Sequence, residues 1–160
     1  MRVVICAKGG RFHGMIDGTD EKILKEYLRD ARQSYREVAR RTGVSPGTVV
    51  SRIKEMEEKG IIQKYSALLD YEKLGYELTV ITEVTVSKGM IVEVAEDIKG
   101  HRQACAIYNV TGDSDVMVIA KFKTRDELSN FTKAVLKIHN VERTRTHLVL
   151  ITLKEDFNIL

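Results

Sequence analysis

The sequence predicts an α+β protein, with an N-terminal three-helix helix-turn-helix domain followed by a C-terminal ferredoxin-like βαββαβ domain. Two observations carry this prediction. Residues 16–60 place apolar side chains at helical spacing between helix caps. After a connector at residues 61–75, residues 76–160 alternate in the order strand, helix, strand, strand, helix, strand. Two crossover units in this order form a four-stranded antiparallel sheet with both helices on one face.

The composition is that of a folded protein without a membrane span. Of 160 residues, 43% are apolar and 31% charged, which excludes a disordered chain. No apolar run approaches the length of about 18 residues that a membrane helix needs, and no signal peptide is recognisable. Cys6 and Cys105 make neither a disulfide framework nor a metal-binding set with histidine. We therefore expect a cytoplasmic protein with reduced thiols and no cofactor or metal.

Residues 1–15 are expected to form an N-terminal extension, because they show no sustained hydrophobic period. Arg2, Lys8 and Arg11 give the segment three positive charges. Two interpretations remain open: a basic arm, or translation from an upstream start codon ahead of a natural start at Met15.

The first two helices are predicted from their caps. Asp17 can cap a first helix with Asp20 at its third position, where negative charge suits the helix dipole. Ser34 and Glu37 form a capping box, so a second helix should begin at Tyr35, and Gly43 is placed to end it. The predicted apolar stripes are Ile23, Leu24, Tyr27 and Leu28 on the first helix, and Tyr35, Val38 and Ala39 on the second.

The third helix completes a helix-turn-helix pattern. Ser45 can cap it, Pro46 suits its first position, and Gly60 ends it. Its predicted core stripe is Val49, Val50, Ile53 and Met56. A short helix, a turn of about three residues and a longer helix form the arrangement that many DNA-binding domains share. A plain helical hairpin within a bundle is the alternative.

The charge distribution supports DNA binding. Residues 17–66 hold 11 Lys and Arg against nine Asp and Glu, whereas residues 67–160 hold 12 against 14. Within residues 31–54 the basic side chains, opposed only by Glu37, are Arg32, Arg36, Arg40, Arg41, Arg52 and Lys54. A locally basic stretch on a small domain is typical of a nucleic-acid interface. For each arginine, a solvated side chain without a partner is the alternative.

The expected DNA contacts follow from placing the third helix in the major groove. Its first turns offer Gly47, Thr48 and Ser51 to bases or phosphates, and Ser45 with the helix N-terminus suits a phosphate. Arg52 and Lys54 should meet phosphates, while the second helix crosses the DNA backbone. The predicted DNA-binding residues are Arg36, Arg40, Ser45, Gly47, Thr48, Ser51, Arg52 and Lys54.

In the second domain, strands are predicted at residues 76–86, 104–111, 115–123 and 141–154, and helices at 91–98 and 125–138. Gly112 and Asp113 should make a tight hairpin turn. Ile81, Met117 and Ile119 would lie on the sheet face that no helix covers, and the last strand is apolar on both faces. An apolar outer face on so small a domain predicts a sheet-to-sheet homodimer.

The whole pattern resembles the Lrp/AsnC family of transcription regulators, also called feast/famine regulatory proteins. The resemblance covers residues 16–153 and rests on the segments DGTDEKIL, EVARRTGVS, RIKEMEEKGII, KLGYELTV and NVTGDSDVMV. It implies a helix-turn-helix domain, a hinge, and a ferredoxin-like effector domain that forms dimers, which often assemble into octamers. It also implies an amino acid bound between dimers, at residues that correspond to Gly112, Asp113, Ser114, Asp115, Thr144 and Thr146.

The chemistry of that turn fits an amino acid. Backbone N–H groups at a glycine turn can hold a carboxylate, and an aspartate can hold an α-ammonium group. The alternative is a turn with no ligand, since Gly and Asp are ordinary hairpin residues.

The function predicted from the sequence is a sequence-specific DNA-binding transcriptional regulator of double-stranded DNA, not an enzyme. It is expected to respond to an amino acid or related small effector and to form a homodimer that assembles to an octamer. One alternative is an architectural DNA-binding protein without an effector. Another is a haem-precursor decarboxylase, an activity of some relatives of this family, but the four histidines are scattered along the sequence.

Overall fold

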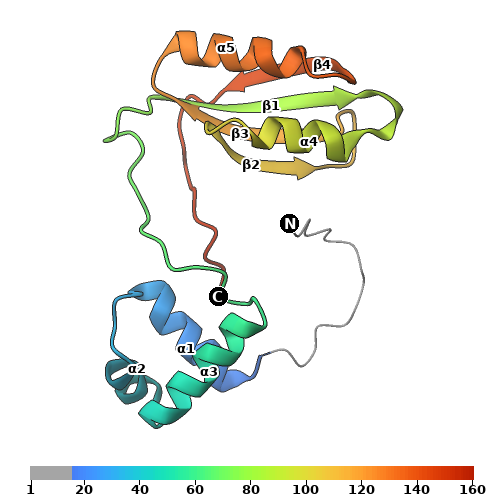
Figure 1. Cartoon of the computed structure of the whole chain (residues 1–160). Helices are drawn as coiled ribbons and strands as arrows, with labels where there is room; N and C mark the ends of the chain where they lie inside the picture. The colour runs from blue at the N-terminus through green and yellow to red at the C-terminus, as the bar shows by residue number, and fades with distance from the viewer. Residues whose placement is uncertain (1–15) are drawn as a thin grey trace. The chain divides into compact units, whose positions relative to one another are not determined.

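The computed structural model describes residues 16–160, except for the side chain of Lys88. The predicted extension at residues 1–15, with its basic residues and Cys6, lies outside the described residues. The chain divides into two compact units (Figure 1). The first, here called the helical unit, runs to Ala67 and includes Asp156–Leu160. The second, the sheet unit, is Leu68–Glu155. No helix among the described residues is long and apolar enough to cross a bilayer.

Three helices form the helical unit: α1 (Gly18–Arg29), α2 (Tyr35–Thr42) and α3 (Pro46–Glu58). Each begins at its predicted cap, where the side chain of Asp17, Ser34 or Ser45 accepts hydrogen bonds from backbone N–H groups of the first turn. Gly43 ends α2 with φ of 75°, a left-handed conformation that glycine adopts without strain. Local capping therefore sets the three helix starts.

The core of the helical unit is narrower than the sequence stripes predict. Its buried apolar residues are Ile23, Leu24, Val38, Ala39, Val49, Ile53 and Met56. Three residues expected in the core are instead exposed: Leu28, Tyr35 and Val50. Three short helices enclose only one stripe of each, so an apolar residue one helical position beyond that stripe stays in solvent.

The sheet unit has the predicted ferredoxin-like topology. Its elements are β1 (Leu78–Val86), a 3₁₀ turn η1 (Ser87–Gly89), α4 (Ile91–Lys99), β2 (Ala104–Asn109), β3 (Val116–Phe122), α5 (Arg125–Leu136) and β4 (Val141–Leu148). The sheet order is β2-β3-β1-β4, and every neighbouring pair is antiparallel. The predicted α+β class and the βαββαβ order are confirmed.

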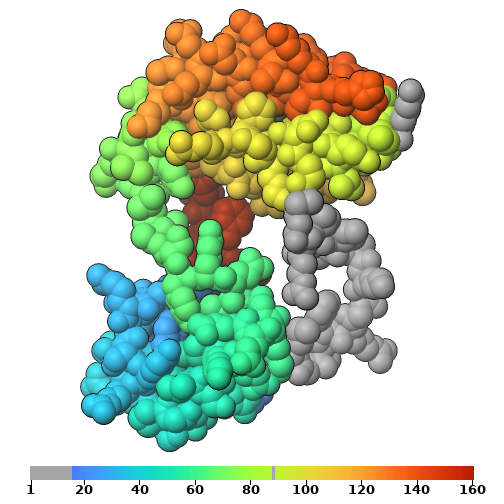
Figure 2. All heavy atoms as spheres, viewed as in Figure 1, coloured from blue at the N-terminus to red at the C-terminus, as the bar shows by residue number. Residues whose placement is uncertain are grey.

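One face of the sheet packs against both helices. In the space-filling view, the atoms of α4 (yellow) and α5 (orange) form an adjoining layer over this unit (Figure 2). The buried residues beneath this layer are Val80, Val84, Val86, Val116, Val118, Ala120 and Phe122 from the strands, with Val94, Ile98, Phe131 and Val135 from the helices. From Thr79 to Val86, burial along β1 alternates, as the period of a strand requires.

The opposite sheet face differs from the prediction at β4. Ile81, Met117 and Ile119 lie on it, as expected, since their strand neighbours Val80, Val116 and Val118 face the helices. The β4 residues on that face are charged or titratable: Arg145 pairs with Glu83 across the β1–β4 ladder, and His147 pairs with Ile81. The prediction that the last strand is apolar on both faces was therefore wrong.

Two strand boundaries also differ. β4 ends at Leu148 rather than at residue 154, and Leu150, Ile151 and Leu153 are exposed. The reason is that β4 pairs only with β1, whose first residue is Leu78, so the ladder runs out of partners. The tight two-residue turn at Gly112–Asp113 is also wrong: six residues, 110–115, connect β2 to β3, and a Val110 N–H bond to the Asp115 carbonyl (3.0 Å) closes the loop.

Candidate DNA interface and effector site

The first turn of α3 is small, polar and well capped. Ser45 Oγ accepts a hydrogen bond from the Thr48 backbone N–H at 3.1 Å and lies 2.9 Å from Thr48 Oγ1. Gly47 and Ser51 are exposed and Thr48 is half-buried. A Cβ placed on Gly47 would meet only Ser45 Oγ, at 3.7 Å. This end of the helix can therefore approach another surface closely along its backbone.

The turn between α2 and α3 has helix-turn-helix geometry. The backbone N–H groups of Gly43 and Val44 both donate to the Ala39 carbonyl, at 2.9 and 3.2 Å. Val49 is fully buried, and Ala39 nearly so. Ala39, Gly43 and Val49 thus hold the two helices together across a tight turn.

Two of the predicted phosphate-binding residues are free to meet a phosphate. Arg36 and Lys54 are exposed, and neither makes an ion pair with another residue in the part of the chain that the structure describes. Arg40 is also well exposed, and its guanidinium lies 3.8 Å from Glu37 in a loose surface pair. Such solvent-exposed cations release counterions when they bind DNA phosphates.

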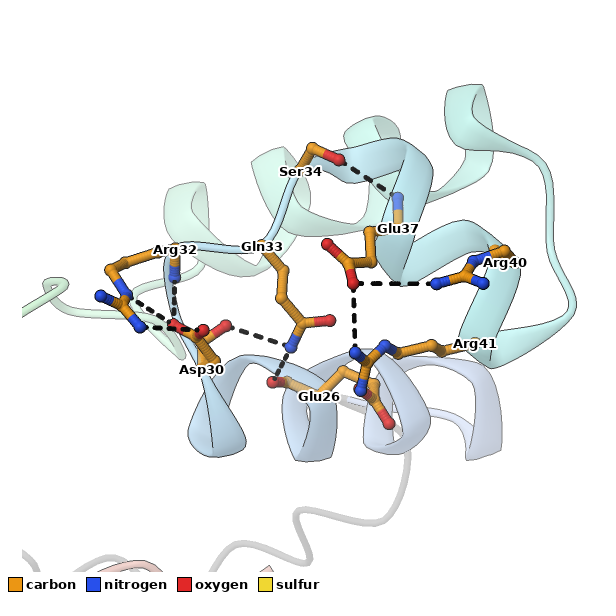
Figure 3. A network of polar contacts seen from close by, with 8 residues as sticks. All are labelled: Glu26, Asp30, Arg32, Gln33, Ser34, Glu37, Arg40 and Arg41. Carbon is orange, nitrogen blue, oxygen red and sulfur yellow. Dashed lines mark hydrogen bonds and ion pairs between the residues drawn. The ribbon is translucent and has the colours of Figure 1, made fainter.

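Other arginines of the basic window hold the helical unit together. Arg41 of α2 contacts Glu37 at 3.1 Å, as Figure 3 shows, and it also contacts Glu26 of α1 at 3.4 Å. In the same network, the Gln33 side-chain amide donates to the Glu26 carbonyl at 2.8 Å. Arg32 makes only a local pair with Asp30 in the turn, at 3.0 Å, and its side chain stays exposed. The contacts of Arg41 and Gln33 with Glu26 join α1 to α2 and to their connecting turn.

Arg52 has carboxylate partners within the unit. Its Nη2 lies 2.9 Å from Asp17 Oδ2, and its Nη1 lies 3.5 Å from Asp20 Oδ2. Asp20 is nearly buried, with 5% of its surface exposed. Asp20 also accepts the Asp17 backbone N–H at 3.0 Å, which completes the capping box of α1. This geometry favours an internal role for Arg52 over the expected phosphate contact.

The predicted effector residues gather around the second half of β1. The Asp115 backbone N–H donates to the Val84 carbonyl at 3.1 Å, and Asp115 Oδ2 accepts the Val86 backbone N–H at 2.7 Å. Gly112, with φ of 119°, and Asp113 are exposed at the tip of the same loop, and Ser114 is half-buried. The Asp115 carboxylate is therefore already engaged, whereas the Asp113 carboxylate faces solvent.

Thr144 and Thr146 approach β1 from its other side. Thr144 pairs with Val84 and Thr146 with Thr82, so both threonines point to the helix-covered face. Thr146 Oγ1 lies 3.1 Å from Thr82 Oγ1, and Thr82 is almost fully buried. Thr82 is a member of this cluster that the sequence analysis missed, because it looked like an ordinary polar position of an alternating strand.

Two known domain families match this chain. Residues 16–63 match winged helix-turn-helix DNA-binding domains, and residues 79–159 match the Lrp/AsnC ligand binding domain. An HTH-type transcriptional regulator of Pyrococcus furiosus is 43% identical over 90% of this chain and 97% of its own. The HTH-type transcriptional regulator FL11 of Pyrococcus horikoshii is 36% identical over 88% of this chain and 93% of its own.

Solved structures share the fold over nearly the whole chain. AsnC of Escherichia coli superposes with a TM-score of 0.81 at 23% identity, covering 88% of this chain and 96% of its own. A transcriptional regulator from Neisseria meningitidis, solved as a complex with L-Met, gives a TM-score of 0.81 at 26% identity, covering 91% and 96%. The chain belongs to the Lrp/AsnC family and is a DNA-binding transcriptional regulator, not an enzyme.

Proposed function

We propose that this regulator reads a specific DNA sequence through α3 and changes its DNA binding when an amino acid or related small effector binds the sheet unit. The observation that carries the proposal is the match of residues 79–159 to a ligand binding domain. The neighbour solved with L-Met, which shares the fold at 26% identity, supports an amino acid as the effector class.

For DNA, the proposed phosphate contacts are the exposed cations Arg36, Arg40 and Lys54, together with Ser45 at the N-terminus of α3. Gly47, Thr48 and Ser51 are proposed to lie toward the base edges. The exposure of Ser51 supports this assignment, since direct readout requires a side chain that reaches the groove, and the exposed Gly47 lets the backbone approach the bases closely.

For the effector, we place the α-ammonium group against Asp113 and the carboxylate against backbone N–H groups near Gly112. Asp115, Thr144 and Thr146 shape the floor of this site through β1, and Ser114 lies between the two carboxylates. The exposed Asp113 carboxylate supports the assignment, because it keeps its acceptors available to a ligand.

For assembly, we propose a homodimer that associates further, toward an octamer, in the cytoplasm. The apolar side chains on the uncovered sheet face, Ile81, Met117 and Ile119, support burial of that face against a second copy. Residues 61–75 would then serve as the hinge between a DNA-reading domain at 16–60 and an effector domain at 76–160.

The effector assignment is tested by thermal shift of the full chain with single L-amino acids, followed by DNA binding with and without the ligand found. A ligand stabilises the state that binds it, so the melting temperature rises with its concentration. Asp113→Asn should weaken the ligand at least about tenfold, because a charge-assisted hydrogen bond is lost.

Asp97→Asn is the matched control, since Asp97 is also an exposed aspartate of the sheet unit but lies on α4. It should leave ligand affinity unchanged. If no amino acid shifts the melting temperature, or if Asp113→Asn binds the ligand as tightly as the wild type, the effector proposal is wrong.

A further inference from the structure

Val50 is an apolar side chain on the recognition helix that nothing in its own unit covers. It is 42% exposed, whereas its neighbour Val49 is fully buried and Ile53 is 2% exposed. Successive residues of an α-helix are rotated by about 100°, so Val50 lies on the flank of α3 beside the core stripe. The folding of the helical unit therefore gives no reason for an apolar residue here.

Two sets of contacts determine how α3 is rotated within its unit. Val49, Ile53 and Met56 face the core. On the flank opposite Val50, Arg52 is joined to Asp17 and Asp20 at the start of α1. Because Arg52 follows Val50 by about 200° around the helix, the ion pairs with α1 hold Val50 on the side turned away from α1.

Val50 belongs to one exposed stripe of α3. Gly47, Val50, Ser51 and Lys54 follow the spacing i, i+3, i+4, i+7, and all four are exposed. Side chains on a helix lean toward its N-terminus, so the methyl groups of Val50 lie over Gly47, which has no side chain to cover them. The stripe thus presents a small polar residue, a branched apolar residue and a cation side by side.

We propose that Val50 is a specificity-determining residue that contacts the 5-methyl group of a thymine in the major groove. The proposal rests on α3 being the DNA-reading helix. That methyl group is the one apolar feature of the major groove, and an aliphatic side chain can recognise it by direct contact. Ser51, next to it, can hydrogen-bond a base edge, and Lys54, one turn further, can bind the adjacent phosphate.

The test uses the full chain and a duplex that the wild-type protein selects from a random-sequence pool. Each thymine of that duplex is then replaced singly by deoxyuridine, which removes only the methyl group. For the wild type, at least one replacement should weaken binding about fourfold, because the free energy of burying one methyl or methylene group corresponds to about that factor in affinity.

Val50→Ala should bind the unmodified duplex about fourfold or more weakly and should no longer distinguish thymine from uracil at that position. Alanine favours a helix and the site is exposed, so the variant should fold. Leu28→Ala is the matched control: Leu28 is 43% exposed on α1, and its removal should leave the thymine preference intact.

Three results would overturn the inference. The first is that no single uracil replacement weakens binding by the wild type. The second is that Val50→Ala keeps the wild-type response to every uracil, and the third is that Leu28→Ala abolishes the same response as Val50→Ala. A wild-type protein that enriches no sequence at all would instead refute sequence-specific reading by α3, and with it this role of Val50.

Discussion

The two units of this regulator hold their helices in different ways. In the helical unit, α1 is tied to α2 by Arg41 and Glu26, and to α3 by Arg52 with Asp17 and Asp20. In the sheet unit, α4 and α5 meet the strands through apolar contacts, and among the described residues no ion pair joins either helix to a strand. A unit with a small core thus relies on charges between helices, whereas the larger core of the sheet unit does without them.

The largest expected effect concerns the apolar core of the sheet unit. Phe122 is fully buried, and its ring centroid lies 5.2 Å from that of Phe131. Phe122→Ala should lower the free energy of unfolding of this unit by about 3–5 kcal/mol, because it leaves a cavity among contacts that no polar interaction replaces. Calorimetry of the full chain measures this loss as an earlier transition of the sheet unit.

The control is Leu136→Ala, since Leu136 is 51% exposed on α5. It should change the free energy of unfolding by less than about 0.5 kcal/mol. Equal losses from the two substitutions would contradict the view that burial, rather than apolar character, stabilises the sheet unit.

The next effect separates the two cations of α3. Arg52→Ala removes the partner of the nearly buried Asp20, so the free energy of unfolding of the helical unit should fall by about 1–3 kcal/mol. The DNA binding of Arg52→Ala should depend on salt concentration as steeply as that of the wild type. Lys54→Ala should do the reverse, lowering the slope of log affinity against log salt by about 0.9 with little change in stability.

Arg52→Lys refines the comparison. One ammonium group cannot reproduce a guanidinium that contacts Asp17 and Asp20 through two different nitrogens, so stability should recover only in part. A drop in salt slope for Arg52→Ala as large as for Lys54→Ala would show that Arg52 binds phosphate after all.

The helical unit also shows how much of the fold and of the DNA interface could be predicted from the sequence. The helix starts were predicted correctly because capping is local: Asp17, Ser34 and Ser45 act on N–H groups two or three residues away. The basic window at residues 31–54 did not reveal which of its arginines are paired, because most of their counter-charges lie outside it. Asp17, Asp20 and Glu26 on α1 neutralise arginines that seemed unopposed along the sequence.

The effector region illustrates the same limit. The strand positions followed from hydrophobic alternation and the sheet topology from the order of the elements, yet the role of Asp115 followed from neither. Its carboxylate binds the backbone N–H of Val86, 29 positions earlier in the chain, and only the folded sheet brings them together. Val50 was placed in the core stripe of the third helix by helical spacing, which does not reveal where three short helices stop covering one another.

The smallest expected effect is the acid response of the helical unit. The backbone N–H of Asp20 is the main cause that lowers the pKa of Asp17 below its ordinary value of 3.8, and Arg52 adds to it, while desolvation opposes both. Because the pKa is lower in the folded state, the unfolded chain takes up the proton first as pH falls. The contribution of Asp17 to stability is therefore complete above pH 3.8 and lost as the pH falls through the lowered value.

Asp17→Asn keeps an oxygen that can accept the Asp20 N–H but has no charge to titrate, so the helical unit of this variant should lose less stability than the wild type on acidification. Arg52→Ala should retain most of the wild-type acid response, since the guanidinium is not the main cause of the shift. Thermal unfolding followed by circular dichroism at stepwise lower pH measures both, and an Arg52→Ala profile as flat as that of Asp17→Asn would instead make the ion pair, not the cap, the source of the acid sensitivity.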